Sequence, residues 1–272
     1  MPQATSPAER RSGRIGECFS RLQAEHRLAL IAYLTVGYPH LDQTPELVEA
    51  AAASGADAIE LGIPFSDPLA DGPTIQAASQ VALKEGVTVR AALKAAQASR
   101  ARVEVPLLFM TYLNPILAFG LDRFCQEAQQ AGVDGLIVPD LPPSEAGALR
   151  SAAAAARLGL VFFVAPTSTD EGIKSACAAA TAFVYCVAVT GVTGARGQLD
   201  GSVVPLVRKL RSFTSLPIVV GFGISKPEHL ELLQREADGV IVASALLDAI
   251  GKAPDDAASQ VRRFLTAFRP VR

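Results

Sequence analysis

The sequence has few residues of the kinds that bind metal ions or form disulfides. Four of its 272 residues are cysteines and three are histidines. The cysteines lie far apart, without a C-x-x-C pair and without a nearby histidine that could complete a ligand set. They are Cys18, Cys125, Cys177 and Cys186. We therefore expect reduced, mostly buried thiols and no metal site.

The sequence also lacks an excess of either charge. Its 25 basic and 27 acidic residues nearly cancel. Proteins that bind nucleic acids or anionic membranes carry a broad basic surface, which this composition does not offer. We expect neither partner, and any phosphate that the protein binds should belong to a small molecule.

No stretch is long and apolar enough to cross a membrane, and residues 1–14 lack the apolar core of a signal peptide. These absences predict a cytoplasmic protein. Residues 1–14 are expected to be flexible. Because no Gly/Ser-rich linker or change in composition follows them, residues 15–272 are expected to form a single domain.

The rest of the sequence alternates about eight short apolar runs with Ala-rich segments of helical period, a pattern typical of parallel strands buried on both faces. It predicts a (β/α)₈ TIM barrel with an extra N-terminal helix, and a doubly wound open sheet is the lesser alternative. The predicted strands are Leu28 to Thr35, Asp57 to Leu61, Pro106 to Thr111, Gly135 to Val138, Leu160 to Val164, Ala182 to Val187, Pro217 to Val220 and Gly239 to Val242.

Helices are expected between these strands, with additional ones before the first strand and after the last. Ser144 is expected to cap one of them, and Pro227 to lie in the first turn of another. The predicted helices include Ile15 to Glu25, Thr44 to Ser54, Pro73 to Lys84, Leu121 to Ala131, Ser144 to Leu158, Asp170 to Ala178, Val203 to Arg211, Pro227 to Gln234 and Asp255 to Phe268.

Small residues follow the last three predicted strands, where barrels often bind phosphate through backbone amides. Each loop alone could be an ordinary tight turn, but three in succession favour an anion site. The candidate residues are Gly194, Gly223, Ala243 and Ser244. A G-x-G-x-x-G motif after the first strand is missing, which argues against a dinucleotide cofactor.

Acidic residues gather after the second predicted strand. Glu60 ends that strand and is expected to point into the barrel mouth, where burial would raise its pKa toward that of a usable acid and base. Asp71 lies in the following loop, and Asp67 is expected to form a turn. The alternatives are a salt-bridged strand end for Glu60 and an ordinary helix-start signal for Asp71.

Other catalytic groups are scarce. None of the three histidines stands beside a nucleophile, and His229 is expected to be a surface residue of a helix. No lysine occupies a strand end where a Schiff-base aldolase would have one, so carboxylates are left for acid–base chemistry. Large side chains at strand ends could line a flat apolar pocket, although such residues more often belong to the core than contact a ligand. They are Tyr33, Met110, Tyr112, Ile137, Tyr185 and Phe222.

The segment from Glu60 to Gln76, ELGIPFSDPLADGPTIQ, resembles the signature of tryptophan synthase α chains. Further similar segments span almost the whole chain from about Arg14. They are Ala32 to Pro39, Tyr112 to Pro115, Val138 to Pro142, Gly191 to Gly194 and Gly221 to Ser225.

The resemblance implies a lyase that cleaves indole-3-glycerol phosphate to indole and glyceraldehyde 3-phosphate in tryptophan biosynthesis. It implies that Glu60 is the acid–base residue and that Asp71 partners the indole N–H. It puts Gly194, Gly223 and Ser244 at the phosphate, with Ala243 beside them, and it adds Thr193 and Ile241 to the substrate pocket.

The resemblance further implies a partner, the tryptophan synthase β subunit, in an α₂β₂ heterotetramer. The β subunit would carry pyridoxal phosphate, and this chain would bind no cofactor. Two loops, residues 64–72 and 190–198, would close over the substrate.

Two residues depart from the family pattern. Val189 stands where some members have arginine, and Ala243 stands where glycine is common, which matters only if that position needs a positive φ. Three other functions remain open. They are an enzyme acting on another sugar phosphate, a non-catalytic partner that activates a second subunit, and a stand-alone lyase that releases free indole.

Overall fold

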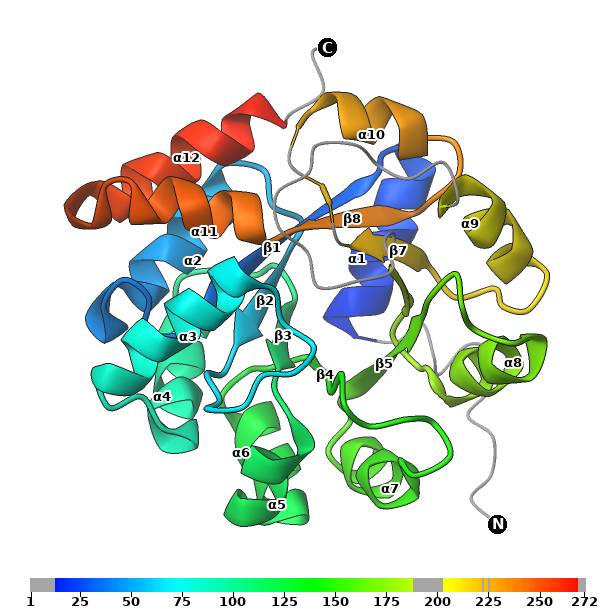
Figure 1. Cartoon of the computed structure of the whole chain (residues 1–272), viewed down its shortest axis with the longest axis horizontal. Coiled ribbons are helices and arrows are strands. Elements are labelled where there is room, and N and C mark those ends of the chain that lie inside the picture. The colour runs from blue at the N-terminus through cyan, green and yellow to red at the C-terminus, as the bar shows by residue number, and fades with distance from the viewer. Residues whose placement is uncertain (1–12, 188–202, 222, 225, 269–272) are drawn as a thin grey trace.

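A computed structural model describes residues 13–187, 203–221, 223–224 and 226–268. Its strands form a closed parallel barrel in chain order, in which β8 pairs with β1 (Figure 1). The strands are β1 (Ala29–Thr35), β2 (Ala58–Gly62), β3 (Leu107–Met110), β4 (Gly135–Ile137), β5 (Gly159–Val164), β6 (Val184–Val187), β7 (Ile218–Gly221) and β8 (Gly239–Val242). Every predicted strand is present, and the (β/α)₈ barrel is confirmed.

The helices surround this barrel, and their inner faces pack on the strands (Figure 1). They are α1 (Arg14–Ala24), α2 (Thr44–Ala53), α3 (Pro73–Lys84), α4 (Val89–Arg100), α5 (Leu113–Phe119), α6 (Leu121–Gln130), α7 (Gly147–Ala155), α8 (Asp170–Ala179), α9 (Val203–Arg211), α10 (Glu228–Leu233), α11 (Ser244–Gly251) and α12 (Ala257–Ala267). Short 3₁₀ turns precede α2 at Leu41–Gln43 and α12 at Pro254–Asp256.

The helices differ from the predictions in two respects. Helices α4, α5 and α11 are not among the predicted ones, because α4 follows α3 without an intervening strand and α5 is a short helix. Ser144 was expected to cap α7, but the residues around it form a turn in which the Glu145 amide donates to the Pro142 carbonyl at 3.0 Å. The helix then begins three residues later, at Gly147.

The extra N-terminal helix closes one end of the barrel. In Figure 1, α1 lies within the ring of the other helices. Its Ile15 side chain packs on Gly135 and Gly159, the first residues of β4 and β5, where an added Cβ would lie 3.0 and 3.4 Å from Ile15 Cδ1. Small residues at these strand starts therefore let α1 seal the end at which the strands begin.

The same end carries a contact that recurs around the barrel. At Leu30, the backbone N–H donates to Asp57 Oδ2 at 3.1 Å, and the Asp57 N–H donates back to the Leu30 carbonyl at 2.7 Å. We call this reciprocal pair a strand-start clamp. The equivalent clamps join Leu107 with Asp134, Leu160 with Thr181 and Ile218 with Asp238.

Arginines neutralise the acidic members of these clamps. Arg27 lies 3.3 Å from Asp57, Arg100 lies 2.9 Å from Asp134 and Arg211 lies 2.6 Å from Asp238. Partly buried carboxylates are tolerated when a cation and hydrogen-bond donors surround them. The end of the barrel at which the strands begin is thus held together by satisfied polar groups.

Candidate active site at the barrel mouth

Glu60 lies in the middle of β2, between Tyr33 of β1 and Leu108 of β3 in the strand register. Its side chain is on the face of the strand that points into the barrel, and the residue is only 1% exposed. Within the described part of the chain, Glu60 Oε2 has no hydrogen-bond partner. Burial raises the pKa of Glu60 to about 8, and the charge of Asp71 contributes to the rise. This is the environment of a carboxyl group that stays protonated at neutral pH.

Asp71 reaches the same place from the loop that follows β2. The helix after this loop is preceded by Gly72 at its N-cap and begins with Pro73, so Asp71 is not a helix cap. Its backbone is fixed by hydrogen bonds to Pro68 and from the Gln76 side chain. Burial raises the pKa of Asp71 to about 6, and a hydrogen bond from Tyr112 opposes the rise. Asp71 therefore ionises before Glu60 as the pH increases.

Tyr112 holds the loop of Asp71 against the barrel. Its hydroxyl accepts a hydrogen bond from the Ala70 N–H at 3.0 Å and donates one to the Asp71 carboxylate. Its ring lies 5.4 Å, between centroids, from that of Phe65 in the same loop. Burial and the Asp71 charge raise the pKa of Tyr112 well above its usual range, so the hydroxyl keeps its proton.

Two further tyrosines cross the mouth above glycines. A Cβ at Gly62 would overlap the Tyr33 hydroxyl oxygen, and one at Gly221 would overlap that of Tyr185. Only glycine fits at either position while the ring stays in place. Burial raises the pKa of both hydroxyls, and the charges of Glu60 and Asp71 add to it. Both hydroxyls therefore lie near the two carboxyl groups.

The described apolar candidates also occupy the barrel. Met110 of β3 pairs with Ile137 of β4, and both are buried. Ile241 of β8 pairs with Ile31 of β1, two residues before Tyr33 on the same strand face. The structure therefore brings together Glu60, Asp71, Tyr33, Tyr112 and Tyr185, with these aliphatic side chains on neighbouring strands.

Part of the predicted phosphate site lies within the described residues. Gly223 has a φ of +80°, which explains glycine there. Ala243 has a φ of −125°, so its methyl group causes no strain. Ser244 is the first residue of α11, where backbone N–H groups lack partners within the helix. The remaining candidates, Thr193, Gly194 and Phe222, and the departure at Val189, lie outside the described residues.

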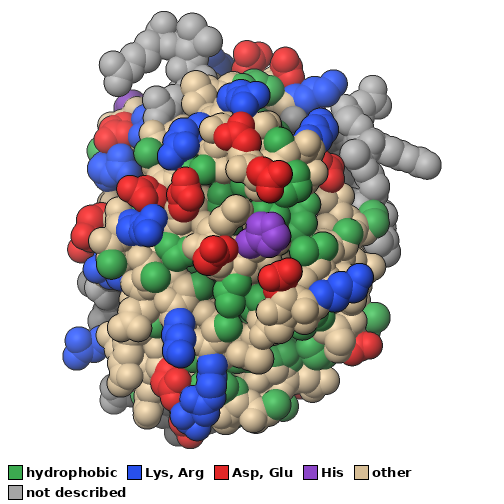
Figure 2. Space-filling view, turned by 90° about the vertical axis from the view of Figure 1, so that its left-hand side faces the viewer, with side chains coloured by type: hydrophobic (Ala, Val, Ile, Leu, Met, Phe, Trp, Pro, Cys, Tyr) green, Lys and Arg blue, Asp and Glu red, His purple; other side chains and the backbone are tan. Residues whose placement is uncertain are grey.

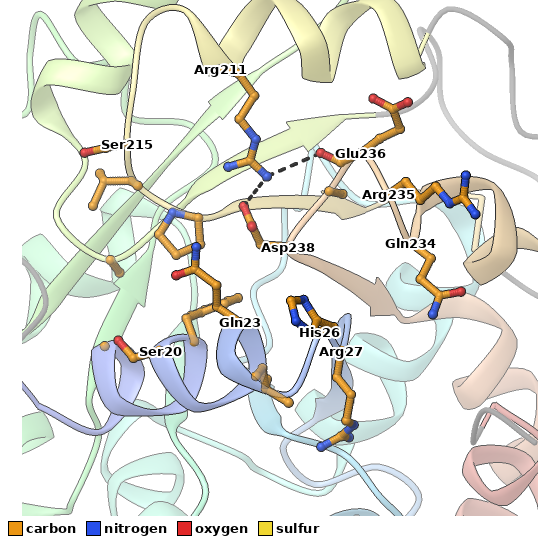
Figure 3. Close-up of a pocket in the computed structure, with 17 residues that line it drawn as sticks. Ser20, Gln23, His26, Arg27, Arg211, Ser215, Gln234, Arg235, Glu236 and Asp238 are labelled. Atoms are coloured by element: carbon orange, nitrogen blue, oxygen red, sulfur yellow. Dashed lines mark hydrogen bonds and ion pairs between the residues drawn. The ribbon is translucent and has the colours of Figure 1, made fainter. Parts of the chain in front are cut away.

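A pocket of 650 Å³ lies at the opposite end, where the strands begin (Figure 3). It is bounded by α1, the end of α9 and the segment between α10 and β8. In Figure 3, Arg211 points to Asp238 and to the backbone of Glu236, so these groups already have partners. Catalytic residues of such barrels come from the other end of the strands. We therefore do not assign catalysis to this pocket.

The surface agrees with the balanced composition. Figure 2 shows basic and acidic side chains interspersed over one side of the molecule, without a basic stripe. No helix within the described ranges is long and apolar enough to span a bilayer. Among the same residues, no group of three or more His, Cys, Asp and Glu side chains could hold a metal ion.

Two residues differ from what the sequence suggested. His229 was expected at the surface, but it is 7% exposed. It lies four residues before the buried Leu233, so the two share the inner face of α10. Asp140 had no expected role, yet its carboxylate accepts a hydrogen bond from the Leu113 N–H, beside Tyr112. The sequence signals were its position two residues after a predicted strand and its place in the Val138 to Pro142 segment that resembles the family.

Comparison with known proteins agrees with this geometry. The model of the family described as "Tryptophan synthase alpha chain" matches residues 19–271. The chain belongs to the tryptophan synthase alpha chain family. A family member from Chloroflexus aurantiacus is 50% identical over 260 residues, covering 93% of this chain and 98% of that relative. One from Solibacter usitatus is 48% identical over 249 residues, covering 92% and 93%.

Solved structures of tryptophan synthase have the same fold. That from Mycobacterium tuberculosis aligns with a TM-score of 0.88 at 37% identity, covering 94% of this chain and 97% of that one. The alpha subunit from Legionella pneumophila aligns with a TM-score of 0.87 at 33% identity over the same shares. The chain is accordingly a lyase of tryptophan biosynthesis that cleaves indole-3-glycerol phosphate to indole and glyceraldehyde 3-phosphate.

Proposed function

We propose that Glu60 is the acid–base residue of this cleavage and that Asp71 stabilises the positive charge that develops on the indole ring. The observation that supports the proposal is the pair of buried carboxyl groups with separated pKa values, about 8 for Glu60 and about 6 for Asp71. Between these values one group is protonated and the other is ionised, which is how environments divide acid and base roles between two carboxyls.

Glu60 first acts as an acid. Its proton is transferred to C3 of the indole ring, which leaves a carboxylate and an indoleninium cation. The carboxylate then removes the proton from the C3′ hydroxyl of the glycerol side chain. The C3–C3′ bond breaks as its electrons return to the ring, giving indole and the aldehyde of glyceraldehyde 3-phosphate. Glu60 ends protonated, ready for the next turnover.

Asp71 faces the ring nitrogen in this scheme. A carboxylate near the N–H stabilises the cation when C3 is protonated, and the stabilisation is worth a few kcal/mol, about 3, in a site from which water is excluded. The contact from Tyr112 keeps Asp71 ionised in spite of its burial. The apparent rate should therefore need Asp71 charged and Glu60 neutral, with an optimum between about pH 6 and about pH 8.

The rest of the substrate would be held by two groups of residues. The indole ring would lie among the side chains of Tyr33, Met110, Tyr112, Ile137, Tyr185, Thr193, Phe222 and Ile241. The phosphate would be bound by backbone and hydroxyl groups of Gly194, Gly223, Ala243 and Ser244. The adjacency of β6, β7 and β8 in the barrel supports one phosphate site for the three loops that follow them.

The partner of this chain would be the tryptophan synthase β subunit, in an α₂β₂ heterotetramer with pyridoxal phosphate on the β subunit. Large apolar side chains exposed after β2 and β3 support such an interface. Leu69 is 89% exposed in the loop after β2, and Leu117 is 53% exposed on α5. The four free, buried cysteines fit a reducing compartment and support a cytoplasmic location. Residues 15–272 would form one domain.

An indole-release assay tests the proposal. The full chain is incubated with indole-3-glycerol phosphate, alone and with a tryptophan synthase β subunit. We expect indole formation, faster when the β subunit is present. A chain that only activates its partner would form no indole in either case. A stand-alone lyase would give equal rates with and without the β subunit, which would contradict the assignment of the partner.

A further inference from the structure

The first turn of α5 is capped from another loop. N-cap residues are usually Ser, Thr, Asp or Asn, whose side chains accept a hydrogen bond from the first amides of the helix. Here the N-cap is Tyr112, and its side chain makes no such bond. Asp140, which follows β4, supplies the acceptor instead. The Leu113 N–H lies 3.0 Å from Asp140 Oδ1 and 3.2 Å from Oδ2.

The reason for this arrangement lies on the other side of Tyr112. Its hydroxyl is occupied by the Ala70 N–H and the Asp71 carboxylate. A Ser or Asp at this position could cap α5 but could not reach Asp71. The start of α5 and the Asp71 loop thus both depend on the position of the backbone at residues 112 and 113. The Asp140 side chain fixes this backbone through the Leu113 N–H.

We propose that Asp140 is a positioning residue for the lyase reaction, which holds Tyr112 in place so that the Tyr112 hydroxyl can orient Asp71. The inference rests on the proposed role of Asp71. It extends that role to a residue that touches no substrate in the scheme. Asp140, Tyr112 and Asp71 connect the loops after β4, β3 and β2 by consecutive contacts.

The charges around Asp71 also make its pKa depend on the position of Tyr112. The described titratable groups that face Asp71 are Glu60, Tyr33, Tyr112 and Tyr185, and only the hydrogen bond from Tyr112 lowers the pKa of Asp71. The Asp140 charge helps to raise the pKa of Tyr112, so the proton stays on the phenol. If Tyr112 moves away, burial alone acts on Asp71, and its pKa rises.

The test compares Asp140→Ala with Asp140→Asn in the full chain, because asparagine keeps one acceptor oxygen for the Leu113 N–H. The pH dependence of kcat/KM is measured for both. In Asp140→Ala we expect the acid limb to move up by about 0.5–1 pH unit, the amount that loss of one hydrogen bond gives. At pH 6, close to the wild-type Asp71 pKa of about 6, this corresponds to a decrease in kcat/KM of roughly two- to fivefold. Asp140→Asn should stay close to the wild type.

Two further variants separate positioning from a loss of stability. Thr88→Ala removes the N-cap of α4, which accepts from the Ala91 N–H at 3.2 Å. It should lower Tm without moving the acid limb. Tyr112→Phe should move the limb at least as far as Asp140→Ala does. A limb that stays at the wild-type pH in Asp140→Ala, or that moves equally in Thr88→Ala, overturns the proposal.

A measurement independent of turnover distinguishes this inference from the proposed function. Carboxyl ¹³C NMR of the full chain reports the pKa of Asp71 directly. We expect it to rise in Asp140→Ala and to stay near the wild-type value in Asp140→Asn. If the wild type makes no indole but this pattern is found, the proposed function is wrong and the positioning contact stands. An unchanged Asp71 pKa in Asp140→Ala refutes the contact's role, whatever the activity.

Discussion

Asp57 and Glu60 stand three positions apart, one just before β2 and the other in the middle of it, and their surroundings are opposite. Asp57, just before β2, accepts from the Leu30 N–H and lies near Arg27 and Arg21. Glu60 is more deeply buried, and its Oε2 atom has no partner among the described residues. The two ends of the barrel therefore differ in how they surround a buried carboxyl group. Asp57 is paired with arginines at the end of the barrel where the strands begin, whereas no cation within the described residues pairs with Glu60.

Pairing does not make Asp57 an ordinary surface acid. Burial raises its pKa more strongly than the Leu30 N–H and the two arginines lower it. The net stabilisation by this cluster is therefore modest, because most of the Coulomb attraction offsets desolvation. What the cluster secures is the register between β1 and β2, since the clamp joins fixed positions on both strands. Substitutions of the two acids test whether stability and catalysis depend on different ends of the barrel.

Replacing Glu60 by glutamine should have the largest effect. The amide has nearly the same shape but can neither donate the catalytic proton nor take one back. We expect kcat for indole formation to fall by about 10³-fold, within the range for loss of a general acid–base group. Steady-state kinetics measure it, and circular dichroism checks that the fold persists. Activity within tenfold of the wild type would remove Glu60 from the mechanism.

The same substitution should increase stability at high pH. A buried carboxyl whose pKa is about 8 binds more protons in the folded chain than in the unfolded chain, so the wild type loses stability as pH rises from about 4.5 to about 8. Glu60→Gln removes this loss. We expect a gain on the order of 5 kcal/mol above pH 8 and little gain at pH 4, from denaturant unfolding at both pH values. A gain that is independent of pH would show that the raised pKa of Glu60 is not its cause.

Asp57→Ala should show the reverse pattern, a loss of stability with little change in activity. It leaves the Leu30 N–H and Arg27 without their carboxylate, and we expect the free energy of unfolding to fall by about 2 kcal/mol. Because the barrel mouth is unaffected, kcat/KM should stay within about twofold of the wild type when stability is sufficient for the assay. A loss of activity as large as that of Glu60→Gln would mean that the two ends are not independent.

The smallest effect is expected at the strand-start clamp between Leu160 and Thr181, which contains no charged group. Thr181 Oγ1 accepts from the Leu160 N–H at 2.8 Å. Thr181→Ala should therefore lower stability by about 1 kcal/mol, and Thr181→Ser, which keeps the hydroxyl, should lower it less. Thermal unfolding of both variants measures the difference. Equal losses would show that the methyl group, rather than the hydrogen bond, stabilises this corner.

The sequence predicts local features well and long-range contacts poorly. Runs such as Leu28 to Thr35 identify strands because burial on both faces leaves only apolar residues. The inward direction of Glu60 follows from its place in such a run. The cap that Asp140 provides to α5 could not be predicted, since it joins residues 27 positions apart. The burial of His229 depends on how α10 packs, which a short helix does not reveal. The roles of Glu60, Asp71 and the phosphate residues stay predictions.

The crossing of Tyr33 over Gly62 limits how this barrel can vary. Any side chain at residue 62 would occupy the space of the phenol, so the two positions cannot change independently. Tyr33 would first have to be replaced by a shorter residue, which would leave that space free. Efforts to reshape the mouth for a bulkier aromatic compound should therefore begin on β1, with β2 altered only afterwards.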